Sequence, residues 1–222
     1  MKRLISFALI AFAALAFVSC GPKNKEEKLA PELAQDARVQ FEKERYEEAI
    51  KIYTKLRDWY PFDKLAVEAE YNIAEAHFNM EAYDEAALAY EEFEKLHPRH
   101  ESIAYIINQQ ALCYFNRLDT VDRDQAQAIK AISVFTRLIR QYPDSAYVEK
   151  AKENREICLK SLAGHEMYVG RFYLKNKKYE SALHRFQTVI DAYAGLGFDE
   201  EAQKLAARSQ KKLAEEKAKG DD

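Results

Sequence analysis

A spacing of 37 residues between two similar segments constrains this chain more than any other feature. The segment YEEAIKIYTKLRDWYP, residues 46–61, recurs as YDEAALAYEEFEKLHP, residues 83–98. Small, aromatic and proline residues recur in one register in four units, and in the fourth unit Ala194 stands where the proline is expected. The recurring residues are Ala37, Ala49, Tyr53 and Pro61; Ala74, Ala86, Tyr90 and Pro98; Ala111, Ala131, Phe135 and Pro143; and Gly170, Ala182 and Phe186. Internal repetition at this period predicts stacked supersecondary units.

The recurring residue types suit pairs of antiparallel helices. Small side chains let two helices approach closely, an aromatic ring fills the gap to the next pair, and proline ends the second helix because it has no N–H. This pattern is that of the tetratricopeptide repeat. Six glycines and five prolines in 222 residues are too few for a turn-rich β-sandwich or barrel. We expect an all-α tetratricopeptide-repeat solenoid of four repeats with a carboxyl-terminal capping helix.

Two irregular spacings interrupt the array. The small residues of the third unit lie 20 apart instead of 12, and the eight extra residues fall in a polar loop at 118–127. Between Pro143 and Gly170 there are 27 positions instead of 13, a surplus of about four helical turns. This surplus predicts one helix of roughly 30 residues, in which Gly164 is a candidate kink.

The amino terminus has the pattern of an export signal. Lys2 and Arg3 precede an apolar run at 4–18, which is shorter than the ~20 residues of a transmembrane helix. The sequence FVSCG at 17–21 resembles the lipobox of bacterial lipoproteins. We therefore predict a signal peptide at 1–19, and at 20–30 a lipidated Cys20 with a flexible tether. Gly21 after the cysteine favours delivery to the outer membrane.

Lipidation would give Cys20 an N-acyl and an S-diacylglycerol group, and the lipid is the only contact with the membrane that we predict. Several acyl chains together hold a protein on a bilayer far more firmly than one chain does. The alternative is an ordinary secretory signal in which the cysteine occurs by chance.

Composition and motifs argue against several classes of function. A net charge of −3 without a basic patch does not suit a nucleic-acid-binding protein. His97 and His100 have a spacing that metal ligands use, but no cysteine or carboxylate lies close by in the sequence, so we predict no metal site. Neither a phosphate-binding glycine loop nor a nucleophile elbow occurs, and we predict neither an enzyme nor a cofactor. Cys113 and Cys158 are expected to pack as small apolar residues, with a disulfide between them as the alternative.

Four short segments carry a resemblance to a known family. They are WYPF at 59–62, VDRD at 121–124, RQYPDS at 140–145 and HEMYVGRFYLKNKKYESALHRFQTVIDAY at 165–193. Together with the lipobox and the irregular spacings, they resemble the BamD family of lipoproteins of the β-barrel assembly machinery. The resemblance extends to about Tyr193. Ala194 and the absence of a second helix in the last repeat depart from the family pattern.

The resemblance implies a non-catalytic scaffold on the periplasmic face of the outer membrane. Residues 31–143, repeats one to three, would bind the carboxyl-terminal segments of unfolded outer-membrane proteins. Residues 144–217, the long helix, repeat four and the capping helix, would bind the periplasmic domains of BamA, and other lipoproteins of the machinery would be further partners. Residues 218–222 are expected to be a disordered tail. The alternative function is a repeat scaffold of another cell-envelope complex.

The resemblance implies a residue for one binding role, and the repeat spacing suggests residues for the other. Arg185 matches a basic residue that the family uses against BamA; alternatively, it lies on a solvated helix face or pairs within its own helix. An aromatic groove for alternate side chains of an extended peptide is expected on the first helices of the repeats. Its candidates are Phe41, Tyr71, Phe78, Tyr105 and Phe115. The alternative is that these rings pack between helices as core.

Overall fold

The computed structural model describes residues 28–220, and side chains for 28–218. This part of the chain contains α-helices and connecting turns and loops, and no strand. The helices are α2 (Ala30–Glu42), α3 (Tyr46–Trp59), α4 (Lys64–Asn79), α5 (Tyr83–Leu96), α6 (Ile103–Phe115), α7 (Ala126–Gln141), α8 (Val148–Lys175), α9 (Tyr179–Ala192) and α10 (Asp199–Gly220). The predicted all-α repeat solenoid is confirmed.

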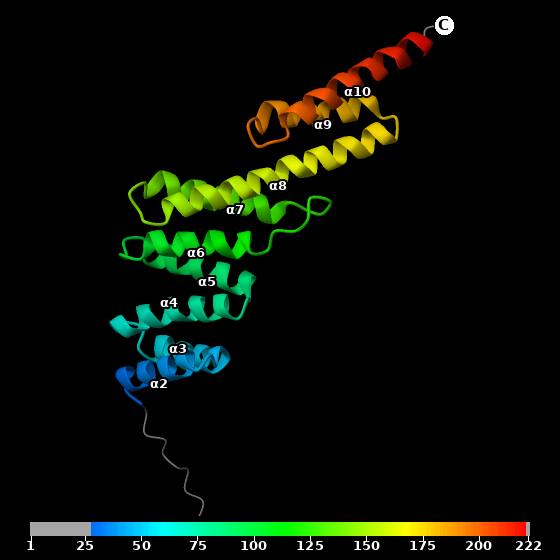
Figure 1. Cartoon of the computed structure of the whole chain (residues 1–222). Coiled ribbons are helices and arrows are strands. Elements are labelled where there is room, and N and C mark those ends of the chain that lie inside the picture. The colour runs from blue at the N-terminus through cyan, green and yellow to red at the C-terminus, as the bar shows by residue number, and fades with distance from the viewer. Residues whose placement is uncertain (1–27, 221–222) are drawn as a thin grey trace, which may run out of the picture.

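Consecutive helices pack in antiparallel pairs that stack along one axis, from α2 at one end to α10 at the other (Figure 1). The closest contacts between non-consecutive helices in this part of the chain are α2 with α4 and α6 with α8. All four are the first helices of their hairpins. First helices therefore form the inner side of the solenoid, and second helices form its outer side.

The turn inside a hairpin has the same geometry in repeats one, two and four. Glu44, Glu81 and Lys177 have φ values of 57°, 58° and 59°. In each case the N–H of the following residue bonds a carbonyl five residues back, as Arg45 does to Gln40 at 2.9 Å. This left-handed residue at the end of a helix is the Schellman type of cap. Repeat three lacks this turn because its eight extra residues lie there.

The small residues of the repeat lie where the sequence places them. Ala37, Ala49, Ala86 and Ala131 are fully buried. A Cβ atom on Gly170 would lie 2.6 Å from the ring of Phe186, closer than van der Waals contact permits. The absence of a side chain therefore lets α8 and α9 touch, and the predicted register is confirmed.

The long helix predicted after Pro143 is α8, with 28 residues, or about 42 Å. Its first half joins the hydrophobic cluster of α4–α7 through Ala151 and Cys158. Its second half joins a separate cluster with α9 and α10 through Met167. The change of packing partner thus occurs inside α8 and not at residue 144.

Gly164 has a packing role within α8, which is one continuous helix from Val148 to Lys175. A Cβ atom there would lie 2.9 Å from Val121 Cγ1. The loop at 116–125, which carries the VDRD sequence, therefore packs directly against α8. His165 Nδ1 lies 2.7 Å from the carbonyl oxygen of Val121, and Ser161 Oγ donates to Gln125 Oε1 at 2.7 Å. These contacts hold the third-repeat loop, which contains the eight extra residues, against α8.

The two cysteines among the described residues lie in the core. Cys113 and Cys158 are free and fully buried, so their predicted role as small core residues is confirmed. Burial raises the pKa of the Cys113 thiol to about 12 and that of Cys158 to about 11.

The capping helix α10 continues to Gly220, past residue 217. The signal peptide at 1–19, Cys20 and the last two residues lie outside the described residues. Within 28–220, none of the helices has the length and apolar character that crossing a bilayer requires.

Candidate binding surfaces

Three tyrosine rings form a row across the inner side of the solenoid. Tyr71 comes from α4, Tyr105 from α6, and Tyr147 immediately precedes α8. Ring centroids are 6.1 Å apart between Tyr71 and Tyr105, and 5.6 Å apart between Tyr105 and Tyr147. The three rings line an open hollow of about 560 Å³ together with Ser102 and Ser145. This tyrosine row is a partly exposed aromatic surface contributed by α4, α6 and the residue before α8.

Glu75 accepts hydrogen bonds from one ring of the tyrosine row and from a buried tyrosine of α5. Its carboxylate accepts hydrogen bonds from Tyr90 Oη at 2.6 Å and from Tyr105 Oη at 3.1 Å. Burial raises the pKa of the Glu75 carboxyl, and the two hydroxyl donors oppose that shift. Burial and the nearby Glu75 raise the pKa of Tyr90 and of Tyr105, so both hydroxyls stay protonated and donate to the carboxylate.

The three predicted phenylalanines lie elsewhere, at the ends of their first helices. Phe41 packs edge-on against Tyr46 at 5.2 Å, Phe78 against Tyr83 at 5.5 Å, and Phe115 against Phe135 at 6.2 Å between centroids. All three are partly buried against the core. Of the five groove candidates, the structure brings together Tyr71 and Tyr105 and gives the phenylalanines intramolecular ring partners.

Tyr147 was missed by the sequence analysis, although a signal for it exists. Tyr105 follows Tyr71 by 34 residues, and Tyr147 follows Tyr105 by 42. Removing the eight extra residues of the third repeat from that interval leaves 34 again. The tyrosine row therefore has its own period, which becomes visible only after the insertion is subtracted.

Arg185 pairs with a neighbouring helix and not within its own helix. It lies on α9, and its Nη1 is 2.9 and 3.0 Å from the two carboxylate oxygens of Glu166 on α8. The Arg185 side chain is 37% exposed and that of Glu166 is 17% exposed. The pair thus joins two helices, and the Arg185 side chain remains partly exposed.

His97 and His100 also have structural partners. His97 Nε2 lies 2.7 Å from a carboxylate oxygen of Glu70, and His100 Nδ1 accepts from the N–H of Ser102 at 3.2 Å. Both imidazole rings also pack against Phe93, with centroids 4.8 and 5.2 Å from its ring. The two histidines therefore fasten the turn between the second and third repeats.

Comparison with known proteins shows the family of this chain. The sequence model of the YfiO family, described as outer membrane lipoprotein, matches residues 26–222. The chain belongs to the YfiO family of outer membrane lipoproteins. The match extends through α10, beyond the point near Tyr193 at which the resemblance noted in the sequence ended.

Three relatives carry the same description, outer membrane protein assembly factor BamD. The outer membrane protein assembly factor BamD of Neisseria meningitidis is 26% identical over 96% of this chain and 85% of its own length. BamD of Rickettsia prowazekii is 30% identical over 87% of this chain and 77% of its own length. BamD of Caulobacter vibrioides is 26% identical over 93% and 75%. The resemblance to the BamD family is confirmed, and a description as assembly factors agrees with the prediction of a scaffold without catalytic activity.

Proposed function

We propose that this protein is a periplasmic scaffold of the β-barrel assembly machinery, anchored to the outer membrane through a lipid on Cys20. Repeats one to three bind the carboxyl-terminal segments of unfolded outer-membrane proteins, and α8–α10 bind the periplasmic domains of BamA. Other lipoproteins of the machinery are further partners. The observation that carries the proposal is the family match over 26–222 to relatives described as assembly factors.

The tyrosine row supports the substrate-binding part of the proposal. Outer-membrane strands alternate apolar and polar side chains, and an extended segment needs a surface for every second one. The rings of Tyr71, Tyr105 and Tyr147 stand about 6 Å apart, close to the spacing of alternate side chains along a strand. Tyrosine provides apolar area together with a hydroxyl.

Binding of a carboxyl-terminal peptide from an outer-membrane β-barrel protein tests the tyrosine row. Tyr147→Ala should weaken binding about tenfold, the result of losing roughly 1.4 kcal/mol. Tyr168→Ala is a matched control, because Tyr168 is a partly exposed tyrosine on α8 outside the hollow. Fluorescence anisotropy measures both affinities, and equal affinity for the Tyr147→Ala variant and the wild type contradicts the assignment.

Capture of BamA tests the role of Arg185. Arg185→Glu places two carboxylates together at Glu166 and should abolish co-purification with BamA. The exchange of both residues, Arg185→Glu with Glu166→Arg, rebuilds the ion pair with its polarity reversed. If the exchange variant folds but fails to capture BamA, Arg185 itself touches BamA. Normal capture by Arg185→Glu contradicts the proposal.

Acyl labelling tests the anchor. Cys20→Ala should lose the lipid label and move from the membrane fraction to the soluble periplasmic fraction, since a protein without acyl chains gains no burial of ~0.8 kcal/mol per methylene. Cys158→Ala is the control for cysteine substitution, because Cys158 is buried within α8. Unchanged membrane retention of the Cys20→Ala protein contradicts lipid anchoring there.

The second candidate, a repeat scaffold of another envelope complex, shares the solenoid and the anchor. Mild detergent extraction followed by affinity capture from the native membrane separates the two. Co-purification of BamA supports the proposed function, and a reproducible set of partners without BamA supports the second candidate.

A further inference from the structure

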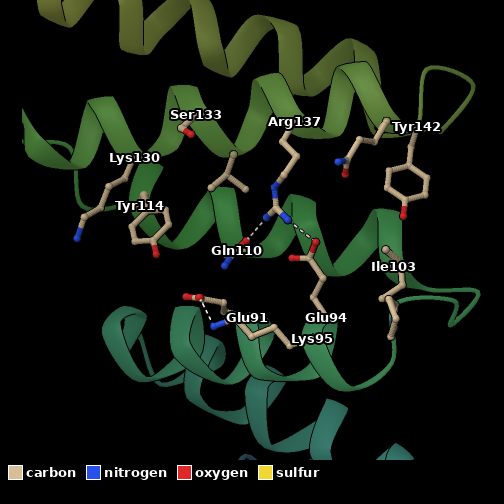
Figure 2. A pocket seen from close by; sticks show the side chains of 13 residues that line it. Glu91, Glu94, Lys95, Ile103, Gln110, Tyr114, Lys130, Ser133, Arg137 and Tyr142 are labelled. Atoms are coloured by element: carbon tan, nitrogen blue, oxygen red, sulfur yellow. Dashed lines mark hydrogen bonds and ion pairs between the residues drawn. The ribbon is translucent and has the colours of Figure 1, made fainter.

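A second hollow lies on the outer side of the solenoid, opposite the tyrosine row. α5 and α7 form its two walls and α6 its floor, as Figure 2 shows, and its volume is about 790 Å³. We call it the outer cleft. It is independent of the inner surface and of Arg185, so it goes beyond the proposed function.

A fixed cation lies in the middle of the outer cleft. Arg137 on α7 donates from Nη1 to the Glu94 carboxylate on α5 and from Nη2 to Gln110 Oε1 on α6, the latter at 2.6 Å (Figure 2). The Arg137 side chain is 30% exposed. Because two different helices hold the guanidinium, its orientation is set before any ligand arrives, and part of its donor set faces the cleft.

Gln110 presents a donor that has no partner in the described part of the chain. The residue is only 4% exposed, and arginine can only donate, so the atom that faces Arg137 must be the carbonyl oxygen. The amide Nε2 therefore points away from Arg137, toward the gap between α6 and α5 (Figure 2). Nε2 is not fully enclosed, so it can donate to an acceptor that a ligand brings into the cleft.

The charges of the outer cleft also favour an acceptor. Its lining includes the cations of Lys95, Lys130 and Arg137 and the carboxylates of Glu91 and Glu94. Both carboxylates are paired, Glu91 with Lys95 at 2.5 Å and Glu94 with Arg137. Lys130 has no carboxylate within ion-pair distance among residues 28–218, and its Nζ stands 5.4 Å from the centroid of the Tyr114 ring. The three cations and two carboxylates leave the lining with one net positive charge.

The corresponding cleft one repeat earlier has the same helix arrangement but different lining residues. The repeat fold alone therefore does not produce the polar groups of the outer cleft. The cleft between α3 and α5 has a volume of about 350 Å³ and is lined by Ile73, Arg57 and Glu92. Ile73 stands 37 residues before Gln110, and Arg57 stands 37 before Glu94. Glu92 stands 45 before Arg137, which is 37 plus the eight inserted residues. Repeat geometry is shared, but of these two clefts the outer one alone has a glutamine on α6 with a free amide and an arginine on its second wall.

We propose that the outer cleft binds an extended acidic segment of a partner protein. One carboxylate of the segment pairs with Arg137 and a second with Lys130, which lies two helical turns earlier on α7, and a backbone carbonyl accepts from Gln110 Nε2. Apolar side chains of the segment rest on Ile103 and Val134, which also line the cleft. Charge complementarity and the unpartnered amide select this occupant over a basic or purely apolar one.

The test uses the full lipoprotein in mild detergent and a fluorescein-labelled octapeptide that alternates glutamate and valine. A second octapeptide carries lysine in place of glutamate. We expect the acidic peptide to bind at least about tenfold more tightly than the basic one, with an affinity that falls as salt rises. Absence of saturable binding of the acidic peptide, or equal affinity for the two peptides, overturns the proposal.

Variants locate the bound peptide. Arg137→Gln and Gln110→Leu should each weaken binding about tenfold. Arg57→Gln removes the same charge from the cleft between α3 and α5 and should leave the affinity unchanged. An equal loss in Arg57→Gln means general charge attraction and overturns the site. If Arg137→Gln lowers the melting temperature, Lys130→Ala decides, because Lys130 is exposed: weakened binding supports the site and wild-type affinity overturns it.

Discussion

The two sides of α6 use polar groups in opposite ways. On the inner side, Tyr105 and Tyr90 both donate to Glu75, so the hydroxyls and the carboxylate satisfy one another. On the outer side, Gln110 accepts from Arg137 and keeps its own amide donor free of any described partner. The inner polar cluster thus contributes to the fold and offers ligands its ring faces, whereas the outer cleft offers hydrogen bonds and charge. Four predictions follow from this difference, and stability measurements check each of them.

The largest effect is expected from Tyr90→Ala in the core, where Tyr90 donates to Glu75. Tyr90 is fully buried, so truncation leaves a cavity and removes a donor from Glu75. The free energy of unfolding should fall by about 3–5 kcal/mol, measured by urea denaturation. Phe172→Ala is the control, since Phe172 is 57% exposed. If both variants lose a similar free energy of unfolding, burial of Tyr90 does not explain the effect.

Removing single hydroxyl groups compares the two sides directly. Tyr105→Phe takes one of two donors from Glu75 and should destabilise the protein by about 1 kcal/mol. Tyr114→Phe removes a hydroxyl of the outer cleft that has no hydrogen-bond partner within residues 28–218, and stability should stay within about 0.5 kcal/mol. Equal losses indicate that the inner hydroxyls are no more coupled to the fold than the outer ones.

The pH dependence of stability tests the burial of Glu75. Its pKa in the folded protein lies above the ordinary value of 4.5, so the folded state binds the proton more tightly than the unfolded state. The free energy of unfolding therefore falls as pH rises from below 4.5 through the raised pKa. Glu75→Gln stays neutral and should remove that fall. Urea denaturation of both proteins between pH 4 and pH 7 measures this fall. If the difference in free energy of unfolding between the wild type and the variant is the same at every pH, the pKa of Glu75 is not raised by folding.

The smallest effect is expected from Lys130→Ala in the outer cleft. Lys130 is exposed, its Nζ stands 5.4 Å from the centroid of the Tyr114 ring, and it has no ion pair among residues 28–218. Its loss should change the free energy of unfolding by less than about 0.5 kcal/mol. A larger destabilisation in a thermal melt means that the outer cleft, like the inner side, contributes to the fold.

Much of the fold could be predicted from the sequence because it depends on residue size at fixed intervals. Ala37, Ala86 and Gly170 set the helix contacts, and the surplus of residues before Gly170 predicted the length of α8. The docking of the third-repeat loop could not be predicted this way. It depends on Val121 meeting Gly164, residues 43 positions apart on elements whose crossing angle no periodicity encodes.

The binding surfaces were predicted less completely, for the same reason. Spacing placed Tyr71 and Tyr105 on one side, but Tyr147 was hidden by the eight inserted residues. For Arg185 the resemblance implied contact with BamA, with a solvated face or a pair within its own helix as the alternatives, and none of these pointed to its partner Glu166 on α8. Pairs between helices depend on how two helices face each other, which requires coordinates.

The continuity of α8 has a mechanical consequence. Its two halves belong to different hydrophobic clusters, yet no break in the helix separates them, so α8 acts as a lever shared by both ends of the molecule. A tilt of roughly 5° imposed at one end of a rod of 28 residues displaces the other end by about 4 Å. A protein that binds α9 and α10 can therefore change the spacing of the tyrosine rings near Tyr147 while α8 stays helical along its whole length.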